Sequence, residues 1–230
     1  MDRSRTGGRL VAKYPEIRWI LPKQARSQRT LDRILDAAEV LVSEKGFDDA
    51  SVAEVVERAG SSVGAFYSRF RDKDGLLYAL HDRFLEQATA TADDALEPGR
   101  WAGHSIPEIL EVVLHFLVAT YRQRSGLIRA FVLRNHSDPE FQARQEHLSH
   151  YVSAKLAALL LARRGQVGHE NPERAVHFGL VMTIGAIESA VLFGDLRTRA
   201  LTLTDDDLAA ELTRAYVAYL GSRPASNPSR

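Results

Sequence analysis

The sequence predicts an all-α protein, in which a small N-terminal helical domain is followed by a larger helical domain. Three observations support this fold class. Apolar residues recur three and four positions apart through most of the chain, which is the period of a helix buried on one face. Alternating apolar and polar runs of useful strand length are absent from the sequence. Capping residues, glycines and prolines stand where the periodic segments begin and end.

The first predicted helix covers residues 27–44. Its apolar stripe consists of Leu31, Ile34, Leu35, Ala38, Leu41 and Val42.

Residues 51–77, which we call the reader, contain two very short helices, a tight turn and the start of a third helix. Ser51 and Glu54 have the spacing of a capping box, so a helix is expected to begin at Ser51. Gly60 supplies the turn, and either of the two serines that follow it can cap the next helix, over residues 63–69. Asp72 is the expected cap of the third helix. This layout is that of a helix-turn-helix that reads the DNA major groove, and a helical core without a nucleic-acid role is the alternative.

The rest of the chain is predicted to form long helices joined by short breaks. A segment rich in proline and glycine, residues 97–105, interrupts the pattern after the first of them. The expected helices cover residues 73–95, 106–124, 127–135, 139–164, 172–193 and 205–220. The predicted domains are a basic extension (1–22), a helix-turn-helix domain (23–72), a helical ligand-binding and dimerisation domain (73–221) and a disordered tail (222–230).

Composition excludes several classes of protein. Apolar residues make up 45% of the chain and charged residues 26%, which is typical of a globular domain. No uninterrupted apolar run approaches the twenty residues of a membrane span, so no membrane partner is expected. The absence of cysteine removes disulfides and thiolate sites and favours the cytoplasm. No enzyme motif and no cofactor motif is present, and His147 with His150 is too small a set to predict a metal site.

Charge is distributed unevenly although the net charge is zero. Residues 1–29 carry eight basic and two acidic side chains. Such a local excess can neutralise DNA phosphates, and a solvated disordered tail is the alternative.

A family resemblance covers about a quarter of the chain. Residues 59–77, AGSSVGAFYSRFRDKDGLL, resemble the second half of the DNA-binding domain of the TetR family, and residues 29–47 are similar to its first helix. Three residues depart from the family pattern: Ser61, Ser68 and Arg71, the last of which stands where proline is common. The resemblance implies a transcriptional regulator, as a rule a repressor, that binds a palindromic operator as a homodimer and is released by a small, largely apolar effector. The alternative is a ligand carrier or partner module of the same fold that does not bind DNA.

The resemblance also implies which residues contact DNA. Ser51, Tyr67 and Lys73 are expected to contact phosphates of the DNA backbone, with Arg29 as a weaker candidate. Ser62, Val63 and Ala65 are expected to contact base edges, because a hydroxyl can form hydrogen bonds with several bases and apolar atoms can contact thymine methyl groups.

The resemblance implies that the larger domain holds the effector pocket and forms the dimer interface through its last two helices, and the sequence adds some support. Pockets between helices are mostly apolar with a few polar groups, and Glu188, His115 and His177 are polar residues on apolar segments. The predicted ligand-binding residues are Phe116, Tyr121, Phe131, Arg134, His177 and Met182, with Phe84 and Ile187 as further lining candidates. The last two helices are expected to form a four-helix bundle with a second subunit, because the first carries small residues such as Gly179 and Gly185 and the second an apolar stripe. Packing within one subunit is the alternative.

Overall fold

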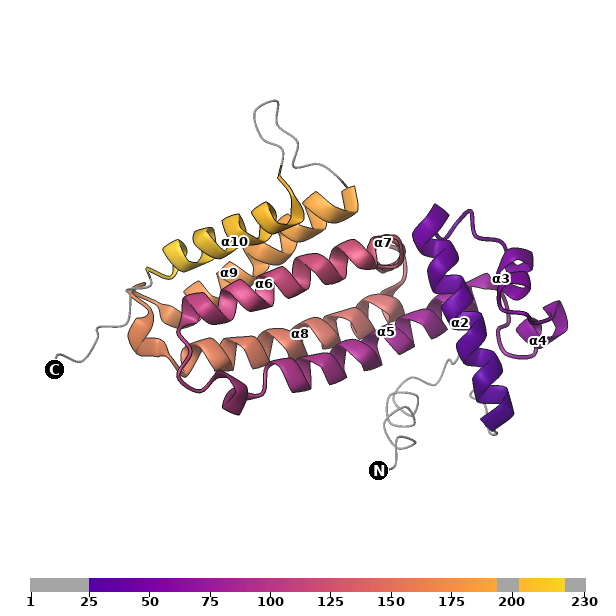
Figure 1. Cartoon of the computed structure of the whole chain (residues 1–230), viewed down its shortest axis with the longest axis horizontal. Coiled ribbons are helices and arrows are strands. Elements are labelled where there is room, and N and C mark those ends of the chain that lie inside the picture. The colour runs from indigo at the N-terminus through magenta and orange to yellow at the C-terminus, as the bar shows by residue number, and fades with distance from the viewer. Residues whose placement is uncertain (1–24, 194–202, 222–230) are drawn as a thin grey trace. The chain divides into compact units, whose positions relative to one another are not determined.

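The computed structural model describes residues 25–193 and 203–221, and all the regular elements in these two ranges are helices (Figure 1). The predicted all-α fold class is therefore confirmed. The predicted basic extension of residues 1–22 and the predicted tail of residues 222–230 lie outside the described residues.

The chain forms two compact units. The first unit comprises the chain up to Ala88 together with Ala130–Gln142, and the second comprises Thr89–Arg129 and the chain from Ala143 onwards. Three helices, α5, α7 and α8, therefore contribute residues to both units. The predicted boundary between residues 72 and 73 assigns all of α5 to the larger domain, whereas the first unit includes α5 as far as Ala88.

The first unit contains three helices in full, α2, α3 and α4, and parts of three others, α5, α7 and α8. A buried aromatic cluster joins the two chain segments of this unit: the His81 ring stacks on Phe141, with centroids 3.8 Å apart, and Tyr78 donates a hydrogen bond to Asp138 at 2.6 Å. The helices are α2 (Ala25–Lys45), α3 (Val52–Arg58), α4 (Val63–Tyr67), α5 (Lys73–Ala95), α7 (Ser125–Asn135) and α8 (Pro139–Leu161).

The second unit contains the remaining helices, with α10 packed against both α6 and α9 (Figure 1). The side chain of Arg122 on α6 donates to both carboxylate oxygens of Asp205 on α10, at 2.7–3.0 Å. The elements are η1 (Pro98–Trp101), α6 (Ile106–Gln123), η2 (Arg164–Gln166), α9 (Pro172–Ile187), η3 (Glu188–Phe193) and α10 (Asp205–Tyr219).

Gly179 allows α9 and α10 of the same chain to approach closely. A Cβ atom at this position would overlap the ring of Tyr216, which is fully buried and donates its hydroxyl to the Val176 carbonyl. Leu208 and Leu212, two apolar residues of the last helix that was expected to face a second subunit, are also buried within the chain. Gly185, in contrast, is exposed, so the small residues of α9 do not all serve the same contact.

Two predicted helices end earlier than expected. The helix predicted to reach Arg164 ends at Leu161, and a turn of 3₁₀-helix follows at Arg164–Gln166. The helix predicted to reach Phe193 changes at Glu188 into a π-helix, in which the wider turn shifts the register of the side chains.

One helical segment of the second unit is unusually apolar. Pro172–Leu192, which covers 21 residues, is long and apolar enough to cross a membrane by length and composition alone. The sequence analysis considered uninterrupted apolar runs, and this helix contains single polar residues such as His177 and Thr183. This is weak evidence for a span, because buried core helices meet the same criterion, and one face of α9 is buried in the second unit.

Candidate nucleic-acid interface

The reader has the local structure that its sequence predicts. Ser51 caps α3 through a capping box with Glu54, and Val55 and Val56 are buried. Gly60 has φ +55°, a left-handed conformation that glycine adopts without steric cost, and it ends α3. Of the two candidate serines, Ser62 caps α4: its hydroxyl accepts a hydrogen bond from the Ala65 amide at 3.1 Å. The turn therefore holds α3 and α4 in contact.

The short helix α4 is held by aromatic residues on one side and exposes other side chains. Phe66 and Phe70 are fully buried, with ring centroids 4.9 Å apart, so a helix of only five residues is anchored by packing. Val63 is 49% exposed and Tyr67 is 55% exposed. An apolar and an amphipathic side chain are thus exposed on a very short helix, and Ser62 beside them is exposed too.

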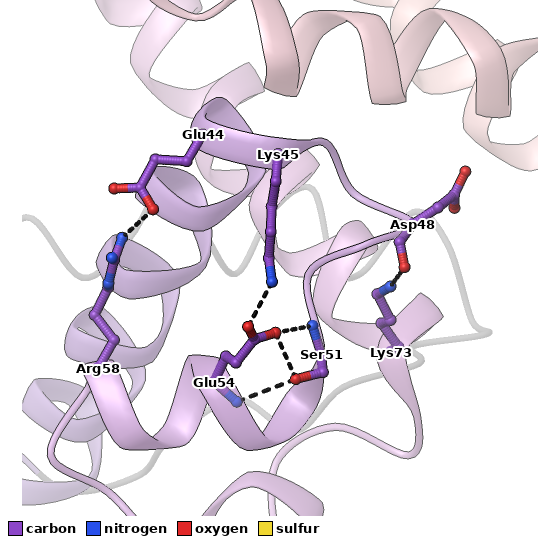
Figure 2. Close-up of polar contacts among 7 residues, drawn as sticks. All are labelled: Glu44, Lys45, Asp48, Ser51, Glu54, Arg58 and Lys73. Atoms are coloured by element: carbon purple, nitrogen blue, oxygen red, sulfur yellow. Dashed lines mark hydrogen bonds and ion pairs between the residues drawn. The ribbon is translucent and has the colours of Figure 1, made fainter.

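Ser51 is engaged within the chain (Figure 2). Its hydroxyl donates to Glu54 Oε2 at 2.6 Å, and its backbone amide donates to the same oxygen at 3.0 Å. Lys45 Nζ lies 2.5 Å from Glu54 Oε1. The Lys45 ammonium and the Ser51 groups together lower the pKa of Glu54 to about 2, so this carboxylate stays charged and keeps the cap in place.

Lys73, at the start of α5, also has a partner inside the first unit (Figure 2). Its Nζ donates to the Asp48 carbonyl at 2.8 Å and lies 4.6 Å from the centroid of the Phe47 ring. These contacts fix the loop that precedes the reader. The ammonium has three protons, so two remain for a phosphate. The predicted cap of this helix, Asp72, is confirmed by a hydrogen bond from the Gly75 amide to its carboxylate at 2.8 Å.

The predicted ligand-binding residues are divided between the two units. Phe131 and Arg134 belong to the first unit, where Phe131 is buried beside His81 and Arg134 forms an ion pair with Asp74. The other four residues, Phe116, Tyr121, His177 and Met182, belong to the second unit.

Within the second unit these four residues differ in exposure. Phe116 is 48% exposed, His177 is exposed and Met182 is partly buried. Tyr121 donates to Glu188 at 3.4 Å, and burial raises the pKa of both side chains. The sequence analysis singled out both residues separately but did not pair them, because 67 positions separate them in the chain.

The second unit also contains a cavity of about 600 Å³ between η1 and the end of α8. None of the predicted ligand-binding residues lines it. Its lining includes Leu96, His104, Lys155, Leu159 and Arg163. Among the described residues, no group of three histidines or acidic residues is arranged to hold a metal ion.

Comparison with known sequences identifies both parts of the chain. The family profile "Bacterial regulatory proteins, tetR family" matches residues 34–80, and the profile "Tetracyclin repressor-like, C-terminal domain" matches residues 105–220. The HTH-type transcriptional repressor BdcR of Escherichia coli is 28% identical over 145 residues, which cover 63% of this chain and 68% of that protein. The uncharacterized HTH-type regulator YvdT of Bacillus subtilis is 38% identical over 65 residues, which span about a third of its length (32%) and 28% of this chain.

Solved structures share the fold. A TetR transcription regulator from Haloarcula marismortui superposes with a TM-score of 0.61 at 20% identity, covering 84% of this chain and 96% of that chain. The regulator FadR from Bacillus subtilis, solved in complex with stearoyl-CoA, superposes with a TM-score of 0.56 at 18% identity, covering 82% and 96%. With one family profile over the reader and a second over half of the chain, this protein belongs to the TetR family of DNA-binding transcriptional regulators.

Proposed function

We propose that the chain binds a palindromic operator as a homodimer, with α4 in the major groove of each half-site, and that a small, largely apolar effector releases it. The exposed Val63 and Tyr67 on an otherwise anchored helix are the observation that carries this proposal. In this assignment Ser62, Val63 and Ala65 meet base edges, and Ser51, Tyr67 and Lys73 meet phosphates. To bind a phosphate, Ser51 turns its single hydroxyl proton from Glu54 to a phosphate oxygen, while its hydroxyl oxygen continues to accept from the Glu54 amide and keeps the cap.

Selection from random double-stranded DNA with the full-length protein tests the DNA-binding part of the proposal. An enriched motif with two inverted half-sites about one helical turn apart supports it. If no sequence is enriched even at low salt, the protein is a ligand carrier of the same fold and the proposal is wrong.

The role of Lys73 is tested separately on the selected operator. Lys73→Ala is expected to weaken binding to all sequences alike and to reduce the salt slope by about one per phosphate contact. Val63→Ala is expected to change the preference among operators and to leave the slope unchanged. Lys155→Ala is the matched control, since Lys155 pairs with Asp93 in the second unit. A loss confined to particular sequences in Lys73→Ala would contradict the phosphate assignment.

The exposed face of α9 supports the proposed dimer. Phe178 is 52% exposed and Val181 is 70% exposed, and Tyr219 of α10 lies beside Phe178 with ring centroids 5.4 Å apart. An apolar surface of this kind on two adjacent helices is suited to isologous packing with a second copy.

A charge placed in this face tests the dimer. Val181→Glu is expected to convert the dimer to a monomer in sedimentation velocity, because an unpaired carboxylate would be buried. Val112→Glu is the control, since Val112 is also an exposed apolar residue (57%) but lies on α6. Equal sedimentation of Val181→Glu and the unmodified protein would place the interface elsewhere.

The effector is proposed to bind among the helices of the second unit, near the four predicted residues that belong to it: Phe116, Tyr121, His177 and Met182. The mainly apolar character of this set and the complex of the related fold FadR with stearoyl-CoA support an apolar effector. Release of DNA then follows from linkage: the effector binds more tightly to a dimer conformation that does not fit the operator than to the one that does. The difference between these two affinities sets how far the effector can shift the dimer away from DNA. Native mass spectrometry of the purified protein, followed by operator titration with the extracted compound, tests this part.

A further inference from the structure

Most of the basic side chains that the structure describes in the first unit have partners within it. Lys45 pairs with Glu54 at 2.5 Å, Arg58 pairs with Glu44 at 2.8 Å, and Arg83 pairs with Asp36 and Glu39, each at 2.5 Å. Arg134 pairs with Asp74. A cation beside a carboxylate adds little net positive potential, so these residues contribute little to the attraction of a phosphate.

Arg33 and Arg71 differ from that group. Both side chains are exposed, and neither makes a hydrogen bond or an ion pair with any other residue that the structure describes. Arg29, one helical turn before Arg33 on α2, is in the same condition, and the sequence analysis already named it as a weaker phosphate candidate. Arg33 was not assigned a role from the sequence, and Arg71 appeared there only as a departure from the family pattern.

The two arginines lie next to the two ends of α4. Arg33 Nη1 is 3.8 Å from the position that a Cβ atom would take on Gly60, so its guanidinium lies beside the turn that leads into α4. Arg71 lies in the segment that leaves α4 after Tyr67 and enters α5 at Lys73. A five-residue helix is roughly 7.5 Å long, and the major groove is about 12 Å wide, so cations at both ends of α4 can reach the phosphates on both sides of the groove.

We propose that Arg33 and Arg71 bind backbone phosphates on the two sides of the groove that α4 reads. The planar guanidinium can donate two parallel hydrogen bonds to a phosphate, and an arginine without a carboxylate partner loses no ion pair when it does so. Contacts of this kind set the position of α4 on the duplex but do not distinguish sequences. This inference rests on the proposed function, since it requires α4 to occupy the groove.

Salt-dependent binding to the selected operator tests the inference, using Arg33→Ala, Arg71→Ala and the double variant of the full chain. Each lost phosphate contact lowers the magnitude of the slope of log K against log salt by about 0.9. When salt is raised from about 50 to 200 mM, the unmodified protein loses affinity. For each single variant this loss should be about threefold to fourfold smaller per bound protomer. The ratio of affinities for the operator and a one-base mutant operator should stay the same.

Arg58→Ala is the matched control, because it removes the same charge from an exposed arginine that is paired with Glu44. Equal melting temperatures for all variants would show that the first unit is intact. A slope that stays unchanged in Arg33→Ala and Arg71→Ala, or that changes equally in Arg58→Ala, would overturn the inference. These outcomes leave operator selection by the unmodified protein intact, whereas failure to select any DNA would refute the proposed function and the inference together.

Discussion

Replacement of Gly179 by alanine should destabilise the second unit, because the added methyl group has no space. A Cβ atom on this glycine would overlap three ring atoms of Tyr216. The ring is fully buried on α10, and its hydroxyl is bonded to the Val176 carbonyl, so it can move only if α9 and α10 separate or the hydrogen bond breaks.

The size of the effect follows from three contributions to the free energy of unfolding. Overpacking a filled core costs about 1–3 kcal/mol. Loss of a hydrogen bond to a buried carbonyl adds about 1 kcal/mol. Alanine favours a helix over glycine by roughly 1 kcal/mol, which acts in the opposite direction. The net loss is about 2 kcal/mol, which lowers the Tm of a chain of this size by roughly 4–8 °C.

Urea unfolding monitored by far-UV circular dichroism at one protein concentration measures this loss. Gly185→Ala is the matched control, because Gly185 lies on the same helix, is exposed, and has no atom within 4 Å of an added Cβ. It should gain up to about 1 kcal/mol from helix propensity. If Gly179→Ala proves as stable as Gly185→Ala, the close approach of α9 to the Tyr216 ring is not present in solution.

Two further predictions concern carboxylates with shifted pKa values. The pKa of Glu54 lies at about 2 instead of 4.5, chiefly because Lys45 donates to it, so its contribution to stability is present above about pH 4.5 and is lost as the pH falls toward 2. Glu54→Gln should therefore lower the stability at pH 7, and the stability of this variant should depend less on pH between these values. Urea midpoints at pH 7, 4 and 3 measure both effects. Identical pH profiles for the variant and the unmodified protein would contradict the role of this carboxylate. The pKa of Glu188 is raised by burial, so this residue favours folding when protonated and disfavours it as the pH rises through its folded pKa. Glu188→Gln should then be at least as stable as the unmodified protein at pH 7. Mild acidification should stabilise this variant less than it stabilises the unmodified protein. Tyr121→Phe removes the only described partner of the carboxylate and should not increase stability at pH 7.

Much of the local structure could be predicted from the sequence, because its causes lie within a few residues of one another. The capping box at Ser51, the left-handed Gly60, the cap at Asp72 and the helix that begins at Lys73 were all predicted and are confirmed. Each depends on a hydrogen bond or a backbone conformation within one helical turn. The family match confirms the predicted class of protein, its cytoplasmic location and its lack of enzymatic activity.

Contacts between distant parts of the chain could not be predicted. The sequence does not reveal that Lys73 donates to the Asp48 carbonyl, or that Tyr121 faces Glu188 across 67 positions, since such pairs depend on how the helices pack. The same limit applied to α9, whose small residues suggested a subunit interface, whereas Gly179 accommodates Tyr216 of the same chain.

The sequence alone thus determined where the helices and their caps lie, because helical periodicity and capping are local properties. Only the tertiary structure decided which charges remain available. Arginines at positions 33, 58, 71 and 83 are chemically identical in the sequence, yet Arg58 and Arg83 meet carboxylates from other helices while Arg33 and Arg71 meet none that the structure describes. Burial and pairing depend on neighbours that are remote along the chain, and these neighbours determine which cations can bind a phosphate.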